Sequence, residues 1–177
     1  MPPAPDPTEL EIMVRAALRA PDHGALQPWR IIEFRTAERS ELAECFAQEK
    51  LRRDPLASAS DLAKAREHAT RPPALLGFVA CPRAKNQVPL REQVLAAGAA
   101  LGNLLNAAYQ LGYGASIHSG ERCFDGKLVE QLGLKPEEWL AGFVSIGTIR
   151  ELPRPARQRA FDSVWSSWSP TLPHQNG

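Results

Sequence analysis

Residues 19–30 read Arg-Ala-Pro-Asp-His-Gly-Ala-Leu-Gln-Pro-Trp-Arg, and this stretch sets the order of elements in the first part of the chain. The residue before a proline is pushed out of the helical region, so Pro21 ends the helix that precedes it. That helix is expected to begin at Thr8, because residues 8–11 (Thr-Glu-Leu-Glu) match a capping box and an apolar stripe at helical spacing follows. A polar loop and then a short buried strand after Trp29 are expected next.

Helical and strand-like segments alternate along the rest of the chain. We expect helices at about 37–50, 60–70, 90–111 and 126–132, and buried strands at 74–80 and 141–147. Gly112 is a natural end for the long helix, since glycine takes the left-handed conformation at little cost. The glycine-rich segment 112–120 that follows is expected to be a loop. Helices that separate short buried strands indicate an α+β or α/β domain.

The long helix contains two glycines, Gly98 and Gly102, among four alanines. Glycine inside a helix costs about 1 kcal/mol relative to alanine, so both positions indicate that another backbone approaches closely. A tightly packed core helix is the default explanation. A seam between two copies of the chain is the alternative, and the Pro-rich, tryptophan-bearing tail favours it.

Length and composition indicate a single domain over residues 1–177, with a Pro-rich arm at 1–7 and a C-terminal extension at 152–177 that is expected to pack on a partner subunit. The net charge of +1 argues against a nucleic-acid-binding protein. No apolar stretch approaches the roughly 20 residues that cross a bilayer, and the N-terminus lacks the pattern of a signal peptide. The three cysteines are widely spaced, which excludes a disulfide framework and favours a cytoplasmic protein.

The motifs of nucleotide-binding loops, zinc proteases and serine hydrolases are all missing from the sequence, and its four histidines share no metal-ligand spacing. We therefore expect no metal and no catalytic side chain. If the protein is an enzyme, a bound cofactor supplies the chemistry.

Three motifs together resemble one family. They are the stretch 20–30 already quoted, the small-residue helix Gly102-Asn103-Leu104-Leu105-Asn106-Ala107-Ala108 with Leu111-Gly112-Tyr113-Gly114 after it, and the strand ending Ile146-Gly147-Thr148. In order and spacing they cover roughly residues 8–150. At these residues the chain resembles the nitroreductase-like flavoproteins, in particular their short single-domain bacterial branch.

The resemblance implies an α+β fold, with a central, mostly antiparallel sheet flanked by helices, in an intertwined homodimer that holds two FMN sites at its interface. It also implies an enzyme in which NAD(P)H passes a hydride to the flavin and leaves. A small planar oxidant, such as a nitroaromatic or a quinone, is then reduced in its place.

The cofactor contacts that the resemblance implies fall into three groups. Arg19 and His23 are expected at the ribityl-phosphate end. Ile117, His118 and Ser119 are expected along the isoalloxazine ring, with the amides of Ser119 and Gly120 facing flavin N5. Arg157 and Arg159 are expected against the phosphate.

The residues by themselves leave plainer explanations open for several of these positions. Arg19 lies in the last turn of its helix, where the helix dipole favours any cation. His23 and the two tail arginines could be solvated, and His118 could contact flavin or substrate or neither.

The printed sequence departs from the family pattern at its start. Relatives carry an additional N-terminal helix with two arginines and a serine that hold the FMN phosphate, and nothing before Thr8 matches it. An alternative to the oxidoreductase is therefore a non-catalytic or weakly flavin-binding relative that keeps the fold and the dimer.

Overall fold

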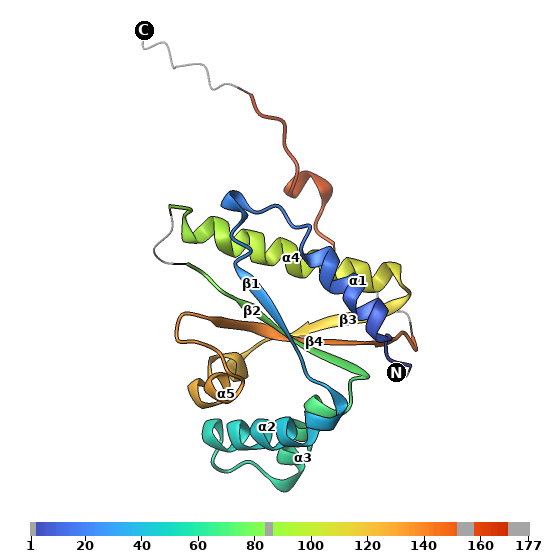
Figure 1. Cartoon of the computed structure of the whole chain (residues 1–177), viewed down its shortest axis with the longest axis vertical. Coiled ribbons are helices and arrows are strands. Elements are labelled where there is room, and N and C mark those ends of the chain that lie inside the picture. Colours follow the sequence, from blue (N-terminus) through green and yellow to red (C-terminus); the bar gives the residue numbers. More distant parts are fainter. Residues whose placement is uncertain (1–2, 84–86, 152–157, 170–177) are drawn as a thin grey trace.

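A computed structural model describes residues 3–83, 87–151 and 158–169. Its helices and strands form three layers, with the sheet in the middle (Figure 1). Helices α1 and α4 cover one face of the sheet, and helices α2, α3 and α5 cover the other. In chain order the elements are α1 Pro7–Ala17, β1 Trp29–Glu33, α2 Arg39–Arg53, α3 Ala59–Thr70, β2 Ala74–Ala80, α4 Leu90–Gln110, β3 Tyr113–His118, α5 Gly126–Gln131 and β4 Trp139–Thr148, with short 3-10 turns at η1 His23–Ala25, η2 Thr36–Glu38, η3 Glu121–Phe124 and η4 Phe161–Ser163.

The sheet has the strand order β1-β2-β4-β3, and every neighbouring pair is antiparallel. Strand β2 is buried along its whole length, which explains its uninterrupted apolar sequence. The order confirms the expected α+β fold with a central antiparallel sheet. It also separates β1 from β3, which form opposite edges three strand spacings, or about 14 Å, apart.

The first helix begins earlier than the sequence predicted. Asp6, rather than Thr8, is the N-cap: its side chain accepts from the N–H of Glu9, and the Glu9 side chain accepts from the N–H of Asp6. Pro7 then occupies the first turn, where its missing N–H costs nothing. Two overlapping capping patterns compete in this sequence, and the one that includes the proline prevails.

The expectation of a loop over residues 112–120 was wrong for most of its length. Residues 113–118 form β3, which pairs with β4 from Tyr113 opposite Thr148 to His118 opposite Phe143. Only Ser119 and Gly120 remain as a connection to η3. Gly112 does end the long helix, and its φ of +87° is the left-handed conformation expected there.

The core consists of two clusters, one on each face of the sheet. The first joins α1 and α4 to the sheet and includes Met13, Trp29 and Leu104. The second joins α2, α3 and α5 to the opposite face and includes Phe46 and Phe143, whose rings meet edge to face at 4.9 Å. The turn after β3 therefore lies on the side of the sheet that α2, α3 and α5 cover.

The default explanation for the two glycines of α4 fails within a single chain. A Cβ added at Gly98 or at Gly102 would meet no atom within 4 Å. No backbone of the described residues packs against them, so the glycines lie on an open face of α4. Large apolar side chains at Leu95 and Tyr109 are exposed on the same helix.

The described part of the C-terminal extension, residues 158–169, is exposed throughout. Phe161 and Trp165 stack on each other at 5.8 Å, and Trp168 is exposed. This segment makes its aromatic contacts within itself, so its packing on a partner remains a prediction.

Candidate functional site

The connection after β3 opens onto a cavity of about 290 Å³ between the sheet and the α2/α3 layer. Two aromatic side chains, Phe46 and Phe143, lie at its walls, and His118, Ser119 and Gly120 form one rim. Gly120 has a φ of +133°, a conformation that side chains rarely adopt, and a Cβ there would meet no atom within 4 Å. The rim therefore includes a backbone conformation that only glycine adopts without strain.

One backbone donor at this rim has no partner among the described residues. The N–H of Ser119 donates no hydrogen bond to any part of the chain that the structure describes, whereas the N–H of Gly120 donates to the sulfur of Cys123. Because an unpaired N–H is costly when it is removed from water, such groups are available to an acceptor atom on a ligand.

A larger open groove, of about 980 Å³, adjoins the cavity. It runs along the outer edge strand β3 and the C-terminal end of α4, and it shares Arg71, Pro72, His118 and Ser145 with the cavity. Ligand pockets for drug-sized molecules span about 300 to 1,000 Å³, so the groove has room for a cofactor of the size of a flavin.

The side chains of β3 divide between the two faces of the sheet. Ile117 is half-buried and packs against the α1/α4 cluster, opposite Val144. His118 points to the other layer, opposite Phe143, and its Nε2 lies 2.9 Å from the hydroxyl of Ser116. Of the residues predicted along the ring, His118, Ser119 and Gly120 line the cavity. The side chain of Ile117 lies on the opposite face of the sheet.

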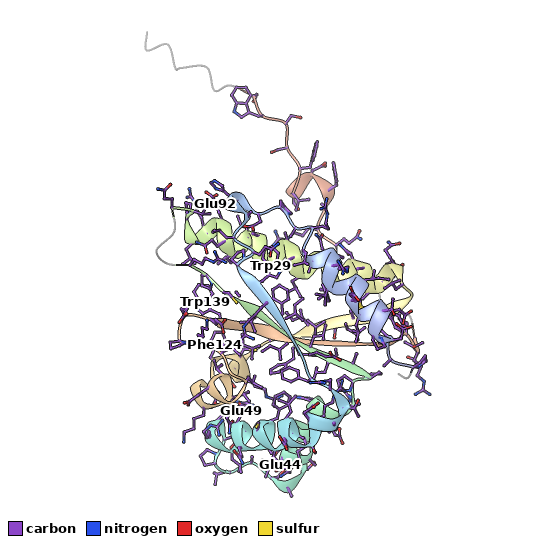
Figure 2. All side chains as sticks on the ribbon, viewed as in Figure 1. Trp29, Glu44, Glu49, Glu92, Phe124 and Trp139 are labelled. Atoms are coloured by element: carbon purple, nitrogen blue, oxygen red, sulfur yellow. The ribbon has the colours of Figure 1, made fainter. Side chains whose placement is uncertain are left out.

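A buried carboxylate holds the segment that follows the rim. Glu49 on α2 is 1 % exposed and accepts from Arg53 Nε at 2.8 Å and from Arg122 Nε at 2.9 Å. The Arg122 guanidinium also lies 4.0 Å from the centre of the Phe46 ring. Figure 2 shows Glu49 on the side of α2 nearer the sheet and α5. Burial opposes ionisation of Glu49, but the two arginines outweigh it and lower its pKa.

His68 on α3 lies beside this network. Its Nδ1 is 3.4 Å from Arg122 Nη1, and it lines the cavity together with His118. Burial lowers the pKa of His68, and the positive charges of Arg122 and Arg71 lower it further. His68 is therefore neutral at physiological pH and offers a polar group without adding charge.

The other predicted contacts lie elsewhere in the chain. Arg19 is exposed, just beyond the end of α1. His23 is exposed in η1, and its Nδ1 lies 2.6 Å from Glu92 Oε2 at the start of α4 (Figure 2). Neither residue lines the cavity or the groove at β3. Within one chain the two halves of the predicted site are therefore apart.

Of the two tail arginines, the structure describes only Arg159. Arg159 is exposed, and Arg157 lies outside the described residues. Their roles stay predictions.

The loop that carries His23 is conformationally unusual. Gly24, Ala25 and Gln27 all have positive φ, of +77°, +49° and +45°. The side chain of Asp22 stabilises the turn by accepting from the N–H of Gln27. Two non-glycine residues in the left-handed region cost of the order of 1 kcal/mol or more each, and such strain is concentrated at functional segments.

The site carries neither a metal cluster nor a reactive thiol within the described residues. No group of three His, Cys, Asp or Glu side chains there could hold a metal ion. Burial raises the pKa of the Cys123 thiol, which lines the cavity.

Sequence reasoning missed the charged and polar members of this site that come from α2, α3 and the turn after β3. Glu49, His68, Arg71 and Arg122 come from two helices and a turn that are far apart in sequence, and their meeting depends on how α2 and α3 pack on the sheet. The spacing of Glu49 and Arg53 on one helix was the only local signal.

Comparison with solved structures defines the class of fold. The chain superimposes on the "Nitroreductase-like Family Protein from Bacillus cereus" with a TM-score of 0.80 and 18% identity, covering 96% of this chain and 89% of the other. It superimposes on a mutant of the "FMN and NADPH-dependent nitroreductase NfnB" from sphigopyxis sp. strain HMH with a TM-score of 0.74 and 18% identity, covering 96% and 92%. The fold is that of the nitroreductases.

Sequence comparison then assigns the family. Residues 1–148 match the model of the Nitroreductase family. The Escherichia coli (strain K12) protein named "Putative NAD(P)H nitroreductase YdjA" is 32% identical over 149 residues, covering 82% of this chain and 79% of that protein. A Haemophilus influenzae protein named "Putative NAD(P)H nitroreductase" is 33% identical over 147 residues, with the same coverage. The chain belongs to the Nitroreductase family.

Among the described residues, no helix is both long enough and apolar enough to cross a bilayer.

Proposed function

We propose that this protein is an FMN-dependent NAD(P)H oxidoreductase of the nitroreductase type. In this role, bound FMN accepts a hydride from NAD(P)H and passes two electrons to a small planar oxidant. The observation that carries the proposal is the unpartnered N–H of Ser119, a residue that lines the cavity between His118 and Gly120. Membership of the Nitroreductase family supports it.

The chain's own residues would bind and orient the flavin rather than react. The free amide of Ser119 would donate to an acceptor atom of the ring. Burial raises the pKa of the Cys81 and Cys123 thiols, and His68 is neutral, so none of these three described side chains is poised to act as a nucleophile.

The proposal includes a homodimer whose two copies complete each site. The open face of α4 supports this arrangement, because Gly98 and Gly102 leave room for close approach and exposed Leu95 offers apolar area. Arg19 and His23 line neither the cavity nor the groove of their own chain, so in this arrangement a partner copy would bring them to the flavin. The C-terminal extension, with its exposed aromatics, would pack on that partner.

The proposal also places the protein in the cytoplasm. The free thiols of Cys45, Cys81 and Cys123 fit a reducing compartment, and NAD(P)H is available there.

Cofactor binding is tested by spectroscopy of the purified protein with added FMN. We expect a bound flavin spectrum near about 450 nm that NAD(P)H bleaches without oxygen and that a nitroaromatic or quinone restores. Protein that binds no FMN would refute the enzyme assignment and leave a flavin-free relative with the same fold.

The shared site is tested by Gly98→Leu. A leucine there meets no atom of its own chain, so the fold should tolerate it, whereas a partner helix should be pushed away. We expect a monomer in analytical ultracentrifugation and a parallel loss of FMN affinity. Ala63→Leu, on an exposed position of α3, is the matched control. A Gly98→Leu variant that keeps both the dimer and the flavin would contradict the shared-site arrangement.

A further inference from the structure

The cavity beneath the rim carries an excess of positive charge. Arg53, Arg71 and Arg122 line it, whereas Glu121 is the single acidic side chain in its lining. Behind the lining, Glu49 adds one more negative charge. Three guanidinium groups against two carboxylates leave the cavity cationic.

The three arginines differ in what they already bind. Arg122 is held by Glu49, and Arg53 is held by Glu49 and by Glu121 at 3.1 Å. Arg71 forms no ion pair and no side-chain hydrogen bond with the described residues. It stands where the cavity and the groove meet, since it lines both. Arg71 is therefore the guanidinium available to an anionic ligand.

The positions of these arginines also affect a neighbouring group on the cavity wall. The pKa of His68 is lowered in part by Arg122 and Arg71, so a group on the cavity wall experiences their positive potential. The same potential that disfavours a second cation stabilises an anion.

Size and wall chemistry restrict what the anion is. A volume of about 290 Å³ lies at the lower limit for drug-sized ligands, which suits one ring and excludes a dinucleotide. Phe46, Leu75 and Phe143 supply apolar and aromatic wall. A guanidinium beside such a wall suits a planar carboxylate, which it can bind through two parallel hydrogen bonds.

We propose that this cavity binds the carboxylate of a one-ring aromatic acid through Arg71 and thereby gives the enzyme a preference for anionic aromatic oxidants over neutral ones. The inference rests on the proposed oxidoreductase function, and it adds a charge requirement for the oxidant that the family membership does not contain. Binding at the cavity is a separate claim from turnover, so the two can be tested apart.

Binding is tested with benzoate, which has the ring and the carboxylate but no reducible group. Calorimetric titration of the FMN-supplemented protein should detect benzoate, and benzamide, the neutral isostere, should bind at least about tenfold more weakly. Arg71→Gln should weaken benzoate by about tenfold, the loss expected for one solvent-accessible charge-assisted contact, without changing benzamide. Arg66→Gln is the matched control, because Arg66 lies on the same helix but pairs with Glu44 outside the cavity.

Two results would overturn the inference at this stage. Equal binding of benzoate to wild type and to Arg71→Gln, with a lower melting temperature, would assign Arg71 to the C-terminal end of α3, where any cation is favoured. Loss of adenosine 2′-phosphate binding in Arg71→Gln, with benzoate unaffected, would assign the charge to the phosphate of the nicotinamide coenzyme.

Turnover separates this inference from the proposed function. With 4-nitrobenzoate and 4-nitrobenzamide as paired oxidants, we expect a KM lower by about tenfold for the acid, and we expect Arg71→Gln to abolish the difference while kcat is retained. Equal KM values for the two compounds would refute the charge preference and leave the oxidoreductase intact. Benzoate binding without reduction of either compound would refute the oxidoreductase and leave the cavity assignment intact.

Discussion

Replacing Glu49 by alanine should destabilise the protein more than any other single carboxylate change that the structure describes. The side chain is 1 % exposed and accepts one hydrogen bond from each of two arginines. Removing one partner of a buried ion pair costs about 3–5 kcal/mol, because the remaining charge is left without compensation. Most of this cost arises at Arg122, because its side chain is only 15% exposed and its charge would stay buried without a partner. The side chain of Arg53 is 36% exposed, so its charge can regain contact with water.

We therefore expect a loss of about 3 kcal/mol, at the lower end of that range. For a domain of this size, 1 kcal/mol corresponds to about 2–4 °C, so the melting temperature should fall by roughly 6–12 °C. Thermal unfolding followed by circular dichroism measures it. The matched control is Glu44→Ala on the same helix, whose exposed pair with Arg66 should leave the melting temperature nearly unchanged (Figure 2).

Two further measurements identify the cause. In the double variant Glu49→Ala with Arg122→Ala, no buried guanidinium is left unpaired. The double variant should therefore lose less stability than the sum of the losses in the two single variants. The pKa of Glu49 is lowered from its ordinary value of 4.5, so its contribution is present above pH 4.5 and is lost as pH falls through the folded value. A fall of less than about 2 °C, or strictly additive losses, would refute the reasoning.

Three other perturbations test separate parts of the fold. Hydrogen bonds from Arg30 lower the pKa of Glu138 to about 2. This pair should therefore stabilise the protein fully above pH 4.5 and progressively less as pH falls towards 2. In urea unfolding, the stability of Arg30→Gln should depend less on pH in this range than that of the wild type. Burial raises the pKa of Cys81 to about 11 from 9.0, which lowers its thiolate fraction at pH 8 by about a hundredfold, so native alkylation followed by mass spectrometry should find it slow, and rapid labelling would contradict its burial. Gly142→Ala would place a Cβ 2.7 Å from a side-chain atom of β3 and should cost about 1–3 kcal/mol of stability. Gly126→Ala is the control and should be tolerated, because its Cβ would meet no atom within 4 Å. Equal melting temperatures for the two variants would contradict the close packing of β3 on β4.

Local chemistry was sufficient to predict most helices and the buried strands. The apolar run 74–80 is bounded by prolines and became β2 with the same bounds. The long helix was predicted to within one residue of its end, because glycine at 112 takes a conformation that few other residues accept. These elements depend on periodicity and backbone preference, which neighbours in sequence carry.

Strand β3 could not be predicted in this way. Its sequence, Tyr-Gly-Ala-Ser-Ile-His, has three small residues in succession and a single β-branched residue, Ile117. Pairing with β4 supplies the backbone hydrogen bonds that make these residues extended. A strand whose stability comes from its neighbour leaves little trace in its own sequence.

In the candidate site, too, the sequence predicted one part and missed another. The motif residues that resemble the family marked the rim at 118–120 in advance, and the structure adds that Ile117 turns to the other face. Cofactor roles for Arg19, His23, Arg157 and Arg159 remain predictions. The cavity itself could not be foreseen, since its arginines and histidines come from separate elements.

By itself, the sequence determined the class of protein and the position of its elements, because helix caps, prolines and apolar periods act over a few residues. Only the tertiary structure decided which charged groups share a cavity. Glu49 and Arg122 are separated by 73 positions, and the pair forms because packing α2 against the sheet removes both from water. Interactions of that kind depend on distance in space and on burial, and neither quantity is a property of a local stretch of chain.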